Sequence, residues 1–247
     1  PYIVPLVGGS LFLAGPITLL LAMLVCSILG VTIEKLAYKP LRFRPKLTIL
    51  ITAIGVSLFL EFGGQLVFGP DPKSFPTLLP SAVLINSPNL VLNSTPVIVI
   101  GTAVALMILL RFIVQKTRMG TAMRAVSYNQ TAASLMGINI STVISFTFVL
   151  GSSLAAAAGI LCGSLYPSIN PLMGVFPGLK AFIAAVLGGI GNIPGAALGG
   201  FIIGLLETFV TGYLSPTYRD AIAFGILIMI LLFRPSGIFG RTEAEKV

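Results

Sequence analysis

The chain has 247 residues, of which 56% are hydrophobic and 9% are charged, and its formal net charge is +8. A mean hydropathy of +1.04 excludes an ordinary soluble domain and indicates an integral membrane protein. The sequence contains no histidine, which excludes a histidine-dependent hydrolase, a histidine-ligated haem and a histidine zinc site. We expect no enzyme activity of its own, no catalytic residue, no metal, no cofactor and no nucleic-acid partner.

Long apolar runs predict an all-α, polytopic transmembrane helical bundle. A helix of about 20 apolar residues crosses the hydrocarbon core, and backbone that faces lipid must satisfy its own hydrogen bonds. We expect about seven membrane segments. Their approximate limits are 16–33, 47–68, 96–114, 140–165, 179–192, 196–213 and 219–233. The chain starts at Pro1 without methionine, signal peptide or basic leader, so we expect an incomplete N-terminus.

The distribution of basic residues predicts the orientation, because Lys and Arg accumulate in cytoplasmic loops. Twelve of the fifteen basic residues fall in or beside three regions that we assign to the cytoplasm. These residues are Lys35, Lys39, Arg42, Arg44 and Lys46, then Arg111, Lys116, Arg118 and Arg124, and finally Arg234, Arg241 and Lys246. The connection 69–95 is rich in proline and poor in charge, so we expect an irregular external loop there.

The stretch AAVLGGIGNIPGAALGG, residues 184–200, interrupts the apolar sequence with glycines and one proline. Glycines that recur every four residues predict a close helix–helix seam. Asn192-Ile193-Pro194 predicts a new helix start after a stop at Gly188-Gly189, and therefore a discontinuous helix near 188–195. Such breaks either pack within protein or line a translocation path. The candidate path residues are Gly188, Gly189, Gly191, Asn192, Gly195 and Gly199.

Three ionisable residues fall inside or at the edge of the predicted spans: Glu61, Lys180 and Glu207. Each needs a partner, a cavity or neutralisation, because a charge in the bilayer is costly. Lys180 either reaches the interface or pairs with Glu207. Glu61 is either protonated or hydrogen-bonded to a neighbouring subunit. All three are candidates for the translocation path.

The loop 115–139 contains a predicted two-turn helix, in which Asn129 is the N-cap and Gly137 is the left-handed terminator. So short a helix is unstable in water by itself. Its small residues on the inner side of the membrane therefore predict a cytoplasmic partner that holds it.

Thr131-Ala132-Ala133 followed by Gly137 resembles the "EAA…G" loop of ABC-importer permeases, although threonine replaces glutamate here. The chain contains four further stretches that carry the resemblance: IEKLAYKPLR at 33–42, LITAIGVSLFL at 50–60, GLKAFIAAVLGGIGNIPGAALGG at 178–200 and RPSGIFGRTEAEKV at the end. Together they resemble the branched-chain amino-acid ABC-importer permease family of the LivH type over almost the whole chain. No match to the upstream family motif "NFAHG" is present.

The resemblance implies one transmembrane permease domain over 1–247, with a cytoplasmic coupling loop at 115–139, in a bacterial or archaeal plasma membrane. It implies a second permease subunit, homologous or identical, two cytoplasmic ATP-binding subunits and an external substrate-binding protein. Transport by alternating access would be driven by ATP that the partner subunits hydrolyse. The family's coupling loop matches Arg124, Ala125, Asn129, Ala132, Ala133 and Gly137.

Two other functions remain open from the residues alone. An ion-coupled secondary transporter or a channel would need carboxylates within its spans to bind the coupling ion, and Glu61 and Glu207 would fit that role. A structural membrane subunit that binds no small molecule would use the same spans for packing only.

Overall fold

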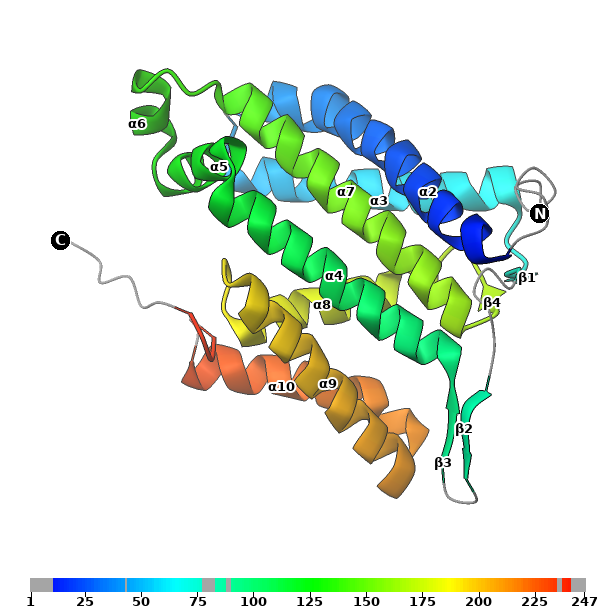
Figure 1. The fold of residues 1–247 in the computed structure, drawn as a ribbon. Coiled ribbons are helices and arrows are strands. Elements are labelled where there is room, and N and C mark those ends of the chain that lie inside the picture. Colours follow the sequence, from blue (N-terminus) through cyan, green and yellow to red (C-terminus); the bar gives the residue numbers. More distant parts are fainter. Residues whose placement is uncertain (1–10, 43, 77–82, 88–89, 235–236, 241–247) are drawn as a thin grey trace. The chain divides into compact units, whose positions relative to one another are not determined.

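The structure is a computed structural model that describes residues 11–42, 44–76, 83–87, 90–234 and 237–240 (Figure 1). The chain divides into two compact units, unit 1 at Pro1–Leu172 and unit 2 at Met173–Val247. The expectations for Pro1, Arg241 and Lys246 concern positions outside the described residues.

Unit 1 is built mainly of helices. They are α2 (Leu11–Ile33), the π-helical η1 (Glu34–Tyr38), the 3-10 helix η2 (Lys39–Leu41), α3 (Lys46–Phe68), α4 (Ser94–Lys116), α5 (Arg118–Tyr128), α6 (Gln130–Leu135) and α7 (Ile140–Leu165). Four short strands join them: β1 (Lys73–Ser74), β2 (Val83–Ser87), β3 (Leu90–Asn93) and β4 (Ser168–Ile169). The pairs β1–β4 and β2–β3 are both antiparallel. The β2–β3 hairpin was not predicted, since the prolines of 69–95 indicated irregular backbone.

Unit 2 consists of α8 (Val175–Gly188), α9 (Ile193–Tyr213), the 3-10 helix η3 (Pro216–Tyr218) and α10 (Arg219–Phe233). Its core is formed by Ile183, Ala184, Ile203 and Ala223, with Leu227 packed against them. These residues come from all three long helices of the unit. The apolar faces of α8, α9 and α10 therefore share one core.

The predicted fold class is confirmed: the chain is a multi-pass helical membrane protein. Five helices among the described residues are long and apolar enough to cross a bilayer. They cover Gly15–Leu41, Leu47–Phe68, Ser94–Lys116, Ile140–Leu165 and Ile193–Tyr213. The predicted segment 179–192 corresponds to α8, but this helix starts at Val175 and ends at Gly188. Its shorter length, 14 residues, reflects the break that the glycines introduce.

Polar caps fix where four of the helices begin. Each cap accepts a hydrogen bond from the backbone N–H three residues later: Thr117 from Gly120, Asn129 from Ala132, Asn139 from Thr142 and Asn192 from Gly195. Such a bond satisfies one of the N–H groups that a helix start leaves unpaired. The caps Asn129 and Asn192 were predicted, whereas Thr117 and Asn139 were not.

Helices α2 and α7 lie side by side in unit 1 (Figure 1). A side chain at Gly30 of α2 would overlap Ser152 of α7, so the glycine allows this close approach. The connection after α2 and the α5–α6 corner lie at one end of unit 1, and all four strands lie toward the other end (Figure 1). The first two basic regions thus share an end, as the charge pattern predicts.

Candidate functional site

Helix α6 stands as a two-turn helix with both ends fixed. At its start, Asn129 Oδ1 accepts from the Ala132 N–H at 3.0 Å. At its end, Gly137 has a φ of 80°, a left-handed conformation that glycine adopts without strain. The Ile138 N–H then donates to the Ala133 carbonyl at 3.1 Å. The predicted cap and terminator are therefore both present.

The buried side of α6 joins it to α5 and α7. Ala133 of α6, Val126 of α5 and Val143 of α7 form one buried apolar cluster. Only 4% of Ala133 is exposed. Because Ala133 faces inward, its small size is needed within unit 1, and a larger residue there would disturb this cluster before it met any partner.

Three exposed apolar side chains flank the outer side of α6: Tyr128 at the end of α5, Leu135 at the end of α6 and Met136 at its C-cap. We call them the exposed apolar tip of α6. Their exposed fractions are 84%, 83% and 82%. Ala132 is exposed as well. Large apolar side chains that extend from a polar loop end favour contact with another surface.

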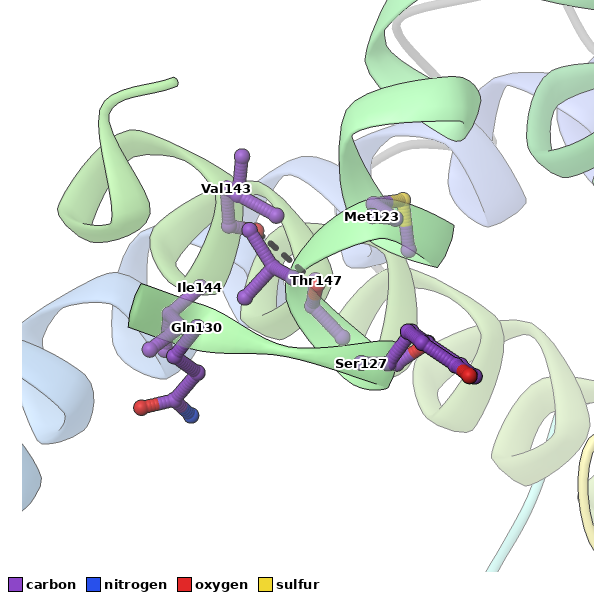
Figure 2. Close-up of a pocket in the computed structure, with 8 residues that line it drawn as sticks. Met123, Ser127, Gln130, Val143, Ile144 and Thr147 are labelled. Carbon is purple, nitrogen blue, oxygen red and sulfur yellow. Dashed lines mark hydrogen bonds between the residues drawn. The ribbon is translucent and has the colours of Figure 1, made fainter. Parts of the chain in front are cut away.

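A cleft of about 380 Å³ opens beside α6, between α5 and α7 (Figure 2). Met123 and Val126 line it from α5, and Val143 and Ile144 line it from α7. The hydroxyl of Thr147 also lines the cleft and donates to the Val143 carbonyl at 2.9 Å, drawn as a dashed line in Figure 2. Ser127 and Gln130 add polar groups to the lining, and Tyr128 of the exposed apolar tip lines the cleft as well.

Arg124 is directed at the end of α4. Its Nη1 donates to the carbonyls of Val114 and Gln115 at 2.9 and 3.1 Å. A cation at a helix C-terminus satisfies the last carbonyls and complements the helix dipole. Ala125, the next residue, packs against the buried cluster of α5, α6 and α7. Arg124 therefore fixes the α4–α5 corner, whereas Ala125 contributes to the packing of α5 against α6 and α7.

In unit 2, the predicted discontinuous helix is present as a break between α8 and α9. Helix α8 ends at Gly188, and Gly189 and Gly191 have φ values of 95° and 94°. Asn192 then starts α9, with Oδ1 accepting from the Gly195 N–H at 3.1 Å. The glycines provide backbone conformations that other residues rarely adopt.

Residues 237–240, near the end of the described chain, form hydrogen bonds with polar groups at this break. The Ile238 N–H donates to the Leu187 carbonyl at 2.8 Å, and Asn192 Nδ2 donates to the Phe239 carbonyl at 3.3 Å. A side chain at Gly189 would collide with the backbone of Gly240. This cover was not predicted, because nothing local in the sequence pairs 237–240 with 187–192.

The close seam between α8 and α9 uses part of the predicted glycine series. A Cβ at Gly188 would collide with the Gly195 backbone, and a Cβ at Gly199 would collide with the Ala184 carbonyl. Gly191, which the four-residue spacing grouped with Gly195 and Gly199, precedes α9 and has open space around it. The seam is therefore made by Gly188, Gly195 and Gly199.

At the other end of the seam, four charged side chains form a network. Lys180 Nζ lies 2.8 Å from Glu207 Oε1 and 2.8 Å from Asp220 Oδ1. Arg219 Nε donates to Glu207 Oε2 at 2.8 Å. Glu207 is 6% exposed, so two cations compensate a buried carboxylate, as a charge within an apolar helix requires.

Lys180 is thus found in the ion pair, the second of the two alternatives that the sequence left open. Arg219 and Asp220 were not predicted, since both stand at the limit of the last apolar run. Glu61 belongs to unit 1, where its Oε1 accepts from the Ser57 hydroxyl, one turn earlier on α3, at 2.8 Å. Glu34, which is fully buried, was not predicted either.

The family described as "Branched-chain amino acid transport system / permease component" matches residues 2–231. The high-affinity branched-chain amino acid transport system permease protein BraD of Pseudomonas aeruginosa is 42% identical over 229 residues, which cover 92% of this chain and 75% of BraD. The corresponding LivH proteins of Salmonella typhimurium and Escherichia coli K12 are each 44% identical over 230 residues, which cover 92% of this chain and 74% of each relative. No solved structure matches the chain significantly.

Proposed function

The chain belongs to the branched-chain amino acid transport permease family, and from this premise we propose that it is the membrane-spanning permease subunit of an ATP-driven importer. Its substrates are branched-chain, aliphatic amino acids. It works with a second permease subunit, two cytoplasmic ATP-binding subunits that hydrolyse ATP, and an external substrate-binding protein. The assembly lies in the plasma membrane of a bacterium or an archaeon.

The observation that carries this proposal is the form of α6. A six-residue helix cannot persist in water by its own hydrogen bonds. Here it is capped at both ends, anchored through Ala133, and presents Leu135 and Met136 to the outside. We infer that the exposed apolar tip of α6 docks on an ATP-binding subunit from the cytoplasmic side, within the coupling loop 115–139.

The anchoring of α6 supports a mechanical role. Because Ala133 packs with Val126 and Val143, α6 cannot shift without moving α5 and the start of α7. Arg124 in turn ties α5 to the end of α4. Movement of the ATP-binding subunits on ATP binding would therefore reach two long membrane helices as a rigid-body displacement.

We propose that the α8–α9 pair contributes to the translocation path, with alternating access produced by repacking along its seam. Glycines at 188, 195 and 199 leave few interlocking side chains along this seam, so a sliding movement disturbs little packing. The pair Lys180–Glu207 holds one end of the seam. Glu61 supplies a further polar group on a membrane helix.

Transport by the complete complex in proteoliposomes tests the proposal. We expect uptake of radiolabelled leucine that requires ATP and the binding protein. Leu135→Asp should abolish both uptake and retention of the ATP-binding subunits, because a charge replaces an apolar contact. Thr131→Glu adds the same charge in the first turn of α6, where the helix dipole favours it, and should preserve both.

Two results would contradict the proposal. Leucine uptake that survives ATP depletion but stops when the ion gradient is collapsed would identify an ion-coupled carrier. Full retention of the ATP-binding subunits by Leu135→Asp would remove the docking role of α6.

A further inference from the structure

A fully buried carboxylate lies where α2 passes into the connection to α3. Glu34 has an exposed fraction of 0%. Its Oε2 accepts a hydrogen bond from the Ser145 hydroxyl on α7 at 2.8 Å. Its Oε1 accepts from Arg42 Nη2, within the same connection, at 3.0 Å. One side chain thus joins α7 to the segment that precedes α3.

This carboxylate continues a close seam between α2 and α7. Gly30 of α2 packs against Ser152 and the Phe148 carbonyl of α7. Beyond Glu34, the ring of Tyr38 lies 5.2 Å from the ring of Phe148. Three contacts therefore hold the end of α2 and the following turn to α7: the close packing at Gly30, the hydrogen bond from Ser145 to the Glu34 carboxylate, and the contact between the two aromatic rings.

The backbone at Glu34 is irregular. Residues Glu34–Tyr38 form a π-helix, a wider turn that is rare and is often found at functional positions. Pro40 lies in the following 3-10 helix, since proline cannot continue a regular helix. Charge-assisted hydrogen bonds are stronger than neutral ones, and here they fix the direction of the chain where the helix itself does not.

Ser145 lies in the second turn of α7, close to α6 along the chain. The Ile138 N–H donates to the Ala133 carbonyl of α6, and the side chain of Asn139 accepts from the backbone N–H of Thr142 in the first turn of α7. The segment between α6 and α7 is thus held at both ends. Contacts therefore run without a gap from α6 through the start of α7 to Ser145, and from Ser145 to Glu34.

On the other side, Glu34 leads toward α3. Arg42 lies four residues before Lys46, where α3 begins. Helix α3 packs against η1, the π-helix that starts with Glu34. The position of α3 in unit 1 therefore depends on the conformation of the connection that Glu34 holds.

We propose that Glu34 is a positioning residue for coupled transport. Through Ser145 and Arg42 it makes the connection 34–45, and with it the start of α3, follow the movement of α7. This inference rests on the proposed ATP-driven function, in which that movement begins at α6. In this proposal the buried ion pair Glu34–Arg42, which lies outside the coupling loop, transmits the movement to the start of α3.

The test uses the complete importer with Glu34→Gln. Glutamine keeps the size of the side chain and one acceptor oxygen but removes the charge that binds Ser145 and Arg42 together. Ser27→Ala is the matched control, because Ser27 lies on α2 in the same seam, with its hydroxyl 3.5 Å from the Val149 carbonyl of α7. That hydroxyl donates to the Met23 carbonyl of its own helix at 2.6 Å, so its removal breaks no charged link to α7. Three quantities are measured: the yield of assembled complex, the rate of ATP hydrolysis, and the leucine imported per ATP.

We expect Glu34→Gln to assemble and hydrolyse ATP near the wild-type level while importing about tenfold less leucine per ATP. Ser27→Ala should keep the wild-type ratio. A wild-type ratio in Glu34→Gln overturns the inference but leaves the proposed function standing. Absence of ATP-dependent uptake in the wild-type complex is a different result, which removes the proposed function itself.

Glu34→Gln could also prevent assembly. Arg42→Gln then provides the comparison, because it leaves the Ser145–Glu34 hydrogen bond in place and removes only the bond to the connection. We expect this variant to assemble and to show the lowered ratio. Failure of both variants to assemble, or a wild-type ratio in Arg42→Gln, identifies a purely structural pair and overturns the inference.

Discussion

Lys180 Nζ lies 2.8 Å from Glu207 Oε1. This ion pair joins α8 to α9 at the end of their seam opposite to the closely packed glycines. The second oxygen of the same carboxylate binds Arg219, from the first turn of α10. One buried carboxylate therefore connects all three long helices of unit 2. Its neutralisation by two cations explains how Glu207 can be buried in an apolar segment.

Replacing Glu207 should weaken unit 2 more than replacing Asp220. Glu207→Gln leaves Lys180 and Arg219 without their shared buried partner, which we expect to lower the free energy of unfolding by about 2 kcal/mol. Asp220→Asn removes a partner whose side chain is 50% exposed, and should cost about 0–1 kcal/mol. Thermal unfolding of the two purified variants in detergent measures the difference. Equal shifts in the two variants would refute a special role for Glu207.

Two glycines of α9 provide a matched test of the seam. At Gly199 an added methyl group would collide with the Ala184 carbonyl, so Gly199→Ala should cost about 1–3 kcal/mol by overpacking. At Gly204 no atom lies within 4 Å of the added carbon, so Gly204→Ala should be neutral or stabilise by about 0.5–1 kcal/mol. Thermal unfolding and leucine uptake report both effects. If both variants behave alike, α8 and α9 do not pack as described.

The N-cap of α6 should matter far more to its helix than the N-cap of α7 does. Asn129→Ala removes a cap worth about 1 kcal/mol from a helix of six residues, and amides 130–137 should exchange about fivefold faster. Asn139→Ala removes the same group from a helix of 26 residues, which tertiary packing holds in place. Hydrogen exchange followed by mass spectrometry compares the two. Unchanged exchange across 130–137 in Asn129→Ala would mean that the cap does not hold α6.

Arg124 is expected to act on the α4–α5 corner within this chain. Arg124→Ala removes hydrogen bonds to two carbonyls of α4, which we expect to cost about 1–3 kcal/mol of stability in the isolated permease. Arg118 is an exposed arginine of the same helix, and Arg118→Ala serves as the control. A loss of ATPase binding in Arg124→Ala without any loss of permease stability would instead place Arg124 at the docking surface.

Features with local causes could be predicted from the sequence. The long apolar runs set the spans, Asn129 and Gly137 set the ends of α6, and Gly189 with Asn192 set the break between α8 and α9. In each case the deciding residues lie within a few positions of the feature. Their physical effect, a cap or a left-handed turn, does not depend on the rest of the fold.

Features that depend on distant partners could not be predicted. Arg219 and Asp220 stand at the edge of a span, where a charge usually faces water. Only the packing of α10 brings Arg219 to Glu207 and Asp220 to Lys180. The burial of Glu34 depends on Ser145, 111 positions later in the sequence. Residues 237–240, which cover the break between α8 and α9, are likewise distant from it in the sequence. A single sequence carries no signal that pairs such positions.

Site-directed cross-linking shows whether an ATP-binding subunit holds α6 from the cytoplasmic side. Leu135→Cys is introduced into a complex whose permease carries Cys26→Ala and Cys162→Ala, with Asp71→Cys, from the loop between α3 and β1, as the comparison. We predict that a short bifunctional reagent joins position 135 to the ATP-binding subunit and leaves position 71 unlinked to it. Cross-linking of position 135 to the external binding protein, or of position 71 to the ATP-binding subunit, would contradict docking of α6 on the ATP-binding subunit.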